Sequence, residues 1–183
     1  MLAFVAEHAF ATLVATVDGR VIVAQAPLIV DGARCLLHLS RANAIAKALP
    51  VAAIAIVTGP NAYVSPDWYR EGDQVPTWNY ESVEIAGELA ATDDDTLREI
   101  LIRESASFEG RIADKRPWTI DKLAPATLAA KLAGIVGVAL VPDDLRGTRK
   151  LSQNKSAADR AGVIEALSAS PREADRAVAE RMR

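Results

Sequence analysis

The chain has 183 residues, 50% of them hydrophobic and 25% charged, a profile typical of one folded domain that excludes a disordered chain. Its 21 basic and 24 acidic residues give a net charge of -3, which excludes a broad positive field for nucleic acid or an anionic membrane surface. The single cysteine, Cys35, excludes an intramolecular disulfide. The sequence has no apolar stretch of ~18–20 residues and no signal peptide, so we expect a cytoplasmic protein with no membrane span.

Two Asp-Gly pairs, Asp18-Gly19 and Asp31-Gly32, separate β-prone runs at the start of the chain. This pair is a strong hairpin signal because glycine accepts the positive φ of a tight turn. We therefore predict an antiparallel meander of three strands. The strands cover residues 12–17, then 21–24 with 28–30, and finally 35–39.

The junction that follows carries the first candidate binding residues, Ser40, Arg41 and Asn43. Ser40 is a good N-cap for a helix that begins at Arg41 and stops before Pro50. Because a helix N-terminus has unpaired amide donors, the Ser40 hydroxyl and the Arg41 guanidinium would form a local phosphate site there. The same residues also suit an ordinary cap without a ligand, which is the commoner arrangement.

The next part of the chain predicts further strands. Residues 51–57 form an apolar run of strand length, 58–60 are typical of a turn, and 62–64 start the returning strand. Apolar and polar residues then alternate over 83–89, which predicts a strand with one face in water.

Aromatic residues gather in an 18-residue window between these strands, which also holds Pro66, Gly72 and Pro76. They are Tyr63, Trp68, Tyr69, Trp78 and Tyr80. Aromatic faces on loops suit a planar ligand or a partner surface. A local core that holds a long loop explains the same residues equally well.

The second half of the chain is more helical. Residues 92–95 predict the start of a helix, 124–132 predict another, and the β-branched run 134–141 predicts a strand that ends at Pro142. Two capping boxes then predict two C-terminal helices within about 154–183. The boxes are Ser156 with Asp159 and Ser170 with Glu173. The fold class is α+β, mainly β, with a six-stranded antiparallel barrel and peripheral helices in one domain over 1–183.

A basic segment precedes the last two helices, with Arg146, Arg149, Lys150 and Lys155 within ten residues. It could contact a phosphate or the polar edge of a heterocycle. It could equally be a solvated turn, which is the commoner meaning of such a run.

Catalytic groups are scarce. His8 and His38 lie beside strand-like apolar runs and suit packing better than a base or a metal pair. The sequence has no zinc, nucleophile-elbow, Walker or Rossmann motif, and Asp93-Asp94-Asp95 lacks the spacing of a calcium loop. We predict no catalytic residue and no metal ligand, so a cofactor must supply any chemistry.

Several segments, in order over nearly the whole chain, resemble the PaiB family of FMN-binding negative transcriptional regulators. The matching segments are residues 8–14, 27–28, 38–43, 59–69, 75–80, 134–137, 150–154 and 159–163. This resemblance implies a split β-barrel related to pyridoxamine-phosphate oxidase and the flavin reductases, and a homodimer with FMN at the subunit interface. The barrel predicted from the strand pattern agrees with it.

The resemblance also implies roles for individual residues. In the wider superfamily a Ser-Arg pair at a strand-to-helix junction holds the cofactor phosphate, which corresponds to Ser40 and Arg41. Two further segments would lie near the flavin or across the dimer contact. They are Thr77, Trp78, Asn79 and Tyr80, and Lys150, Ser152, Gln153 and Asn154.

Three departures separate this chain from the family pattern. Gln25-Ala26 precede Pro27 where members commonly carry Ser-His before Leu-Pro, and Asn61 stands where many have histidine. The aromatic segment that usually precedes the first strand is missing.

The leading interpretation is an FMN-binding homodimer of the PaiB type. One alternative is a flavin reductase or FMN-dependent oxidoreductase that takes hydride from a nicotinamide, and another is an interaction module that keeps the fold without the cofactor. The acidic net charge and the lack of a DNA-reading helix argue against direct operator binding. A regulatory role would then act through a partner or a small-molecule signal.

Overall fold

The computed structural model describes all residues from 1 to 183. The strands are β1 (Phe10–Val17), β2 (Arg20–Asp31), β3 (Arg34–Ser40), β4 (Val51–Val64), β5 (Thr77–Ala91) and β6 (Ile135–Lys150). The α-helices are α1 (Leu2–His8), α2 (Ala44–Lys47), α3 (Asp94–Glu109), α4 (Pro125–Leu132), α5 (Ala157–Ser168) and α6 (Glu173–Met182), and the 3₁₀ helices are η1 (Pro66–Trp68) and η2 (Ile120–Lys122).

The six strands close into a barrel in the order β1-β2-β3-β6-β5-β4. β1 closes the ring because it pairs antiparallel with two neighbours, with Val14 opposite Val23 of β2 and opposite Ile54 of β4. β2, β3 and β6 follow as antiparallel neighbours. The predicted fold class, a mainly β six-stranded antiparallel barrel with helices, is confirmed.

The first hairpin forms at the predicted Asp-Gly pair. Asp18 and Gly19 have φ values of 50° and 73°, and Val17 pairs with Arg20 on either side of them. Two positive φ values in a two-residue loop fit the twist of the flanking strands, which is why Asp-Gly is favoured there. In the second hairpin Asp31 pairs with Arg34, and of the two loop residues only Gly32 has a positive φ, of 60°.

The chain divides into two compact units. Unit 1 consists of residues 1–57 and 84–146, and unit 2 consists of residues 58–83 and 147–183. β4, β5 and β6 contribute residues to both. The single domain expected from the sequence stays a prediction.

Unit 1 holds the interior of the barrel, which is filled by large apolar side chains such as Leu13, Leu37 and Leu140. Cys35 is also buried, and burial raises the pKa of its thiol to about 11. The thiol therefore stays protonated at neutral pH and does not react as a thiolate.

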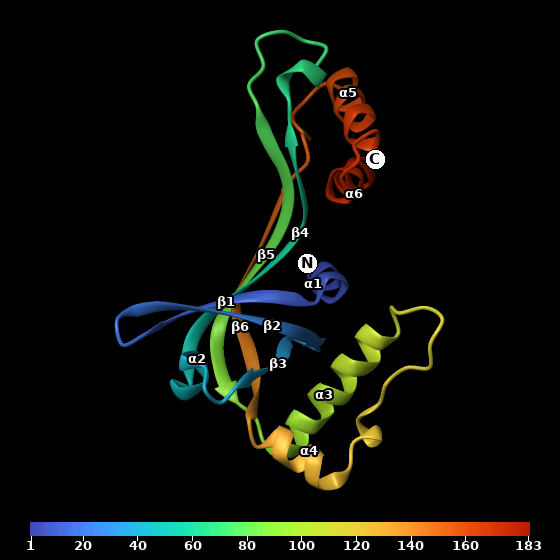
Figure 1. The fold of residues 1–183 in the computed structure, drawn as a ribbon. Helices are drawn as coiled ribbons and strands as arrows, with labels where there is room; N and C mark the ends of the chain where they lie inside the picture. Colours follow the sequence, from blue (N-terminus) through green and yellow to red (C-terminus); the bar gives the residue numbers. More distant parts are fainter. The chain divides into compact units, whose positions relative to one another are not determined.

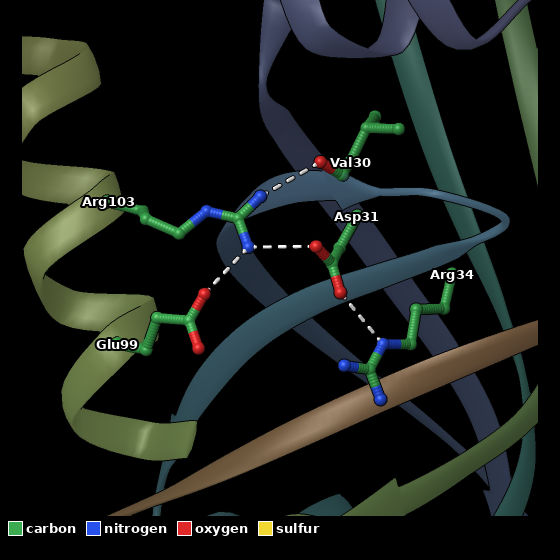
Figure 2. Close-up of polar contacts among 5 residues, drawn as sticks. All are labelled: Val30, Asp31, Arg34, Glu99 and Arg103. Carbon is green, nitrogen blue, oxygen red and sulfur yellow. Dashed lines mark hydrogen bonds and ion pairs between the residues drawn. The ribbon is translucent and has the colours of Figure 1, made fainter. Parts of the chain in front are cut away.

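Helix α3 covers the outside of β2 and β3 in unit 1 (Figure 1). Ile100 packs against Leu36 and Ala139 beneath it. Arg103 anchors the helix, because its guanidinium donates to Asp31 at 2.9 Å and to the Val30 carbonyl oxygen at 3.2 Å (Figure 2).

Asp31 is the centre of this network. Hydrogen bonds from Arg34 and then Arg103 lower the pKa of Asp31, although partial burial opposes them. The carboxylate therefore stays charged over a wide pH range, and it holds the helix to the β2–β3 hairpin (Figure 2).

The helix predicted from Arg41 is much shorter in the structure, and Ser40 is not its cap. α2 covers only Ala44–Lys47, and Asn43 is the N-cap, with its side chain accepting the Ile45 amide. The Arg41 amide instead donates to the carbonyl oxygen of Gly134, the residue directly before β6. That long-range bond extends the pairing of β3 and delays the helix by three residues.

Two predicted strand ends are also wrong. β4 continues through Thr58-Gly59-Pro60 to Val64, so no turn forms there. β6 continues through Pro142 to Lys150. A proline lacks only its own amide donor, and a strand tolerates it where that amide would not be bonded.

The C-terminal helices pack in unit 2. Their core consists of Ala62, Val64, Tyr69, Leu151, Val163, Leu167, Val178, Ala179 and Met182. Figure 1 shows α5 and α6 beside the ends of β4 and β5.

α5 is capped by Ser156 as predicted. α6 begins at Glu173 without a side-chain cap, so the box predicted at Ser170 is wrong, and the Ser170 hydroxyl donates to Asp175 instead.

Asp159 ties α5 to the loop after η1. It is 1% exposed, and its Oδ1 accepts the Arg70 amide at 2.7 Å and the Glu71 amide at 3.2 Å. Desolvation opposes ionisation, yet the hydrogen bonds from Glu71, Arg70 and Ser156 and the charge of Lys155 together lower the pKa of Asp159.

We predict that Asp159 makes unit 2 sensitive to acid. Because its folded pKa lies below the unfolded value of about 3.9, its stabilising effect is present above pH ~4 and is lost as the pH falls through the folded pKa. Urea unfolding of Asp159→Asn should show a lower midpoint than the wild type at pH 7 and a smaller difference at pH 3. Exposed Asp67, replaced by Asn, is the control. An equal difference for Asp159→Asn at both pH values would contradict the prediction.

None of the helices combines the length and the apolar character needed to cross a membrane.

Candidate functional site

Ser40 and Arg41 present their polar groups to solvent at the end of β3 in unit 1. The Ser40 Oγ accepts the Ala42 amide at 3.2 Å, so its hydroxyl hydrogen remains available to a ligand. The Arg41 side chain is exposed and forms no hydrogen bond or ion pair within the chain. One hydroxyl donor and one unpaired guanidinium therefore lie next to each other.

The backbone amides of Arg41, Ala42, Asn43 and Ile45 already have acceptors within the chain. The Arg41 amide donates to Gly134, the Asn43 amide to the Ser40 carbonyl oxygen, and the Ile45 amide to Asn43 Oδ1. Asn43 thus caps α2 rather than facing a ligand with its Oδ1. An anion at this junction would depend on side chains, and a guanidinium beside a hydroxyl suits a phosphate monoester.

The aromatic window divides into two groups in unit 2. Tyr69 is buried in the core beneath α5 and α6, and Trp68 packs against it. Tyr63, Trp78 and Tyr80 are 42%, 48% and 37% exposed. The window thus supplies both a local core and a solvent-facing aromatic surface, one for each of the two interpretations left open by the sequence.

The exposed group lies on one face of the β4–β5 ribbon. Trp78 and Tyr80 are two residues apart on β5, as strand geometry requires for side chains on one face, and the Trp78 ring meets the Tyr63 ring edge-on at 5.9 Å. A cavity of about 300 Å³ lies beside Trp78 and Tyr80. Its lining residues are Thr58, Gly59, Asn61, Trp78, Tyr80 and Glu81.

Sequence reasoning missed Thr58, Asn61 and Glu81 as lining residues. Asn61 could have been found from the spacing of Asn61 and Tyr63, which repeats that of Trp78 and Tyr80. The turn predicted at 58–60 concealed this spacing, because a turn there would have ended the strand before Asn61 and Tyr63. No alternation of this kind marks Thr58 or Glu81.

Asn79 and Ser152 meet inside unit 2, although 73 residues separate them. Asn79 is 0% exposed and Ser152 is 5% exposed. The Ser152 hydroxyl accepts from Asn79 Nδ2 at 3.0 Å and lies 3.2 Å from Asn79 Oδ1, and Nδ2 also lies 3.3 Å from Met182 Sδ. The pair satisfies its own polar groups and links β5, the loop after β6, and α6.

We predict that Asn79→Ala lowers the stability of the protein by about 1–3 kcal/mol, because the buried Ser152 hydroxyl loses its partner. Ser152→Ala should cost a similar amount, and the double variant less than the sum of both, since one interaction is lost only once. Urea unfolding measures all three, with exposed Asn154→Ala as the control. Additive losses would contradict the prediction.

Each cation of the basic segment has a partner within the chain, but only two of the four partners are carboxylates. Arg146 pairs with Asp144 and Arg149 with Glu81. Lys150 Nζ donates to Thr77 Oγ1 at 2.6 Å, and Lys155 lies over the Tyr69 ring with its Nζ 5.0 Å from the ring centre. The charges of Arg146 and Arg149 are thus offset by carboxylates, whereas Lys150 and Lys155 keep their charge beside uncharged partners.

The remaining predicted residues of this segment have local roles or face solvent. Gln153 bonds to the Arg149 carbonyl oxygen and the Leu151 amide, whereas Asn154 is exposed. The structure thus brings residues 77–80 and 149–153 together within unit 2, and Ser40, Arg41 and Asn43 belong to unit 1.

The histidines contact neighbouring side chains. His38 Nδ1 lies 2.9 Å from Glu104 Oε2 beneath α3, and the His8 ring lies 4.4 Å from that of Phe4. No group of three or more His, Cys, Asp or Glu side chains gathers in a way that could hold a metal ion.

Comparison with known proteins identifies relatives over most of the chain. Residues 1–143 match a family model described as "Putative FMN-binding domain". The protease synthase and sporulation protein PAI 2 of Bacillus subtilis strain 168 is 34% identical over 170 residues, which cover 90% of this chain and 81% of that protein.

Two solved structures share the fold. An FAD and heme binding protein from Mycobacterium smegmatis has a TM-score of 0.62 at 19% identity, over 87% of this chain and 74% of its own. The flavocytochrome Anf3 from Azotobacter vinelandii has a TM-score of 0.59 at 14% identity, over 87% and 71%. The predicted resemblance to the PaiB family is confirmed, and the chain belongs to the family of FMN-binding domains that this match defines.

Proposed function

We propose that this FMN-binding, PaiB-like protein holds the phosphate of FMN at Ser40 and Arg41. The observation that carries the proposal is the unpaired, exposed Arg41 guanidinium beside a Ser40 hydroxyl that still has its hydrogen to donate. These donors fit a phosphate with about two negative charges, and the neighbouring amides are already bonded within the chain. Bound FMN would supply redox chemistry, while this chain's residues bind and orient it.

The test is a titration of FMN into the purified full-length protein, followed by the visible spectrum and by quenching of flavin fluorescence. We expect saturation at one FMN per chain at micromolar concentration, and weaker binding of riboflavin, which has no phosphate. Equal affinity for FMN and riboflavin would contradict a phosphate site at Ser40 and Arg41.

A homodimer is the assembly that we propose for this protein. Tyr63, Trp78 and Tyr80 form an exposed aromatic face on one ribbon, and Tyr and Trp are enriched in interfaces of about 1,200–2,000 Å². Light scattering at micromolar concentration should give the dimer mass, and Trp78→Glu should shift it toward the monomer. Val21→Glu, at a 69% exposed position in unit 1, is the matched control. A monomeric wild type would overturn the assignment.

We also propose that any regulatory role acts in the cytoplasm and without direct operator reading. Support for this comes from the net charge of -3 and from the ion pairs that neutralise Arg146 and Arg149. DNA affinity depends largely on cations that are free to neutralise phosphates. Nanomolar binding to one DNA sequence at physiological salt, lost on scrambling that sequence, would contradict it.

A further inference from the structure

A second cavity, of about 450 Å³, lies in unit 1 among α3, η2 and α4. Most of its wall is apolar and comes from Ile120, Leu123, Pro125, Leu128, Ala129 and Leu132. No residue of α4 is buried, so Leu128 and Leu132 keep part of their apolar surface open to the cavity. Its volume falls within the ~300–1,000 Å³ of small-molecule pockets.

One cation lines this cavity. Arg98 of α3 is exposed and has no hydrogen bond or ion pair within the chain. Arg103, one and a half turns further along the same helix, is fully engaged with Asp31, Glu99 and Val30 (Figure 2). Because that network fixes α3 on the barrel, the backbone that carries Arg98 is held in place beside the apolar wall.

Asp121 of η2 is the other charged lining residue, and it forms no ion pair with Arg98. A guanidinium presents a planar fork that matches the two oxygens of a carboxylate. The Asp121 carboxylate would repel a second negative charge, so the lining suits one anionic head group followed by an apolar tail.

We propose that this cavity binds an aliphatic monocarboxylate, with the carboxylate on the Arg98 guanidinium and the alkyl chain along Leu123, Leu128 and Leu132. The site is separate from Ser40 and Arg41 and does not depend on FMN. It would give the protein a second binding site for small molecules, selective for the charge and the alkyl-chain length of the ligand.

The test uses three probes of equal length, octanoate, octanol and octylammonium, titrated calorimetrically into the full-length protein. Octanoate should bind saturably below about 1 mM and at least ~tenfold more tightly than octanol, because only the carboxylate gains a charge-assisted bond. Octylammonium should bind more weakly still.

Two substitutions should act in opposite directions. Arg98→Gln should weaken octanoate about tenfold and abolish its advantage over octanol, while Asp121→Asn should tighten octanoate roughly two- to fivefold by removing a repulsion. Arg20→Gln, at an exposed arginine outside the cavity, is the matched control. Thermal unfolding of each variant should match that of the wild type, which checks that the fold persists, and the FMN titration reports separately on Ser40 and Arg41.

Three results would each overturn the proposal. They are no saturable octanoate binding below about 1 mM, octanol binding as tightly as octanoate, and an Arg98→Gln variant that binds octanoate like the wild type. Preferential binding of octylammonium would show that Asp121, not Arg98, sets the ligand charge, and would overturn it too.

Discussion

Replacing Gly162 with alanine should lower the stability of the protein by about 3 kcal/mol, at the upper end of the usual cost of overpacking. A Cβ on Gly162 would lie 2.2 Å from the carbonyl oxygen of Trp68 and 3.5 Å from its carbonyl carbon. Both are backbone atoms, so no side-chain rotation can relieve the contact. α5 would have to move away from η1 or the chain around Trp68 would have to shift.

The surrounding contacts resist either movement. Ser65 caps η1 by accepting the Asp67 amide, and Asp159 of α5 holds the amides of Arg70 and Glu71. A shift of α5 would therefore break buried hydrogen bonds as well as apolar packing.

Urea unfolding measures the loss, and Gly72→Ala is the matched control. Gly72 lies in the neighbouring loop, a Cβ added there would have no other atom within 4 Å, and the φ of Gly72 is not positive. The control should stay within about 0.5 kcal/mol of the wild type. If Gly162→Ala were as stable as the control, the close packing of α5 on η1 would be contradicted.

Local signals predicted the parts of the fold that local chemistry determines. The Asp18-Gly19 hairpin needs two positive φ values, and the sequence supplies residues that accept them. Ser156 caps α5 because its hydroxyl reaches an amide within the same turn. These contacts join residues close in sequence, so a short segment contains all the residues that determine the turn or the cap.

Long-range pairing decided the elements that sequence reasoning placed wrongly. Ser40 and Asn43 are both good cap residues, and the bond from the Arg41 amide to Gly134 selects Asn43 by extending β3. β4 passes through Gly59 and Pro60 as a continuous strand with β5 as its neighbour, against the local preference of these residues for a turn. No window of the sequence contains these partners.

The candidate site shows the same division. Exposure of Arg41 follows from its position just beyond a strand end, where a charged side chain stays in water. The burial of Asn79 does not follow from its neighbours, because its partners Ser152 and Met182 lie 73 and 103 residues away. A polar residue between Trp78 and Tyr80 resembles a ligand contact until those partners are known.

Arg41→Ala should weaken FMN by roughly ten- to a hundredfold, which corresponds to the loss of about 1.5–3 kcal/mol from one charge-assisted interaction. No other group should compensate for this loss of FMN affinity, because the amides of Arg41 and Asn43 are bonded within the chain and cannot replace the guanidinium. Arg41→Lys should recover part of the affinity, since an ammonium keeps the charge but not the planar fork. The fold should persist, because Arg41 is exposed and has no partner in the chain.

The phosphate site at Ser40 and Arg41 is best tested by titrating FMN and riboflavin into the wild type and into Arg41→Ala. Exposed Lys47→Ala, on the neighbouring helix α2, controls for the general loss of one positive charge. We expect Arg41→Ala to weaken FMN by at least ~tenfold, to leave riboflavin unchanged, and to differ from Lys47→Ala in its effect on FMN. Identical FMN curves for the wild type and Arg41→Ala, or an equal loss for FMN and riboflavin, would contradict a phosphate site at these residues.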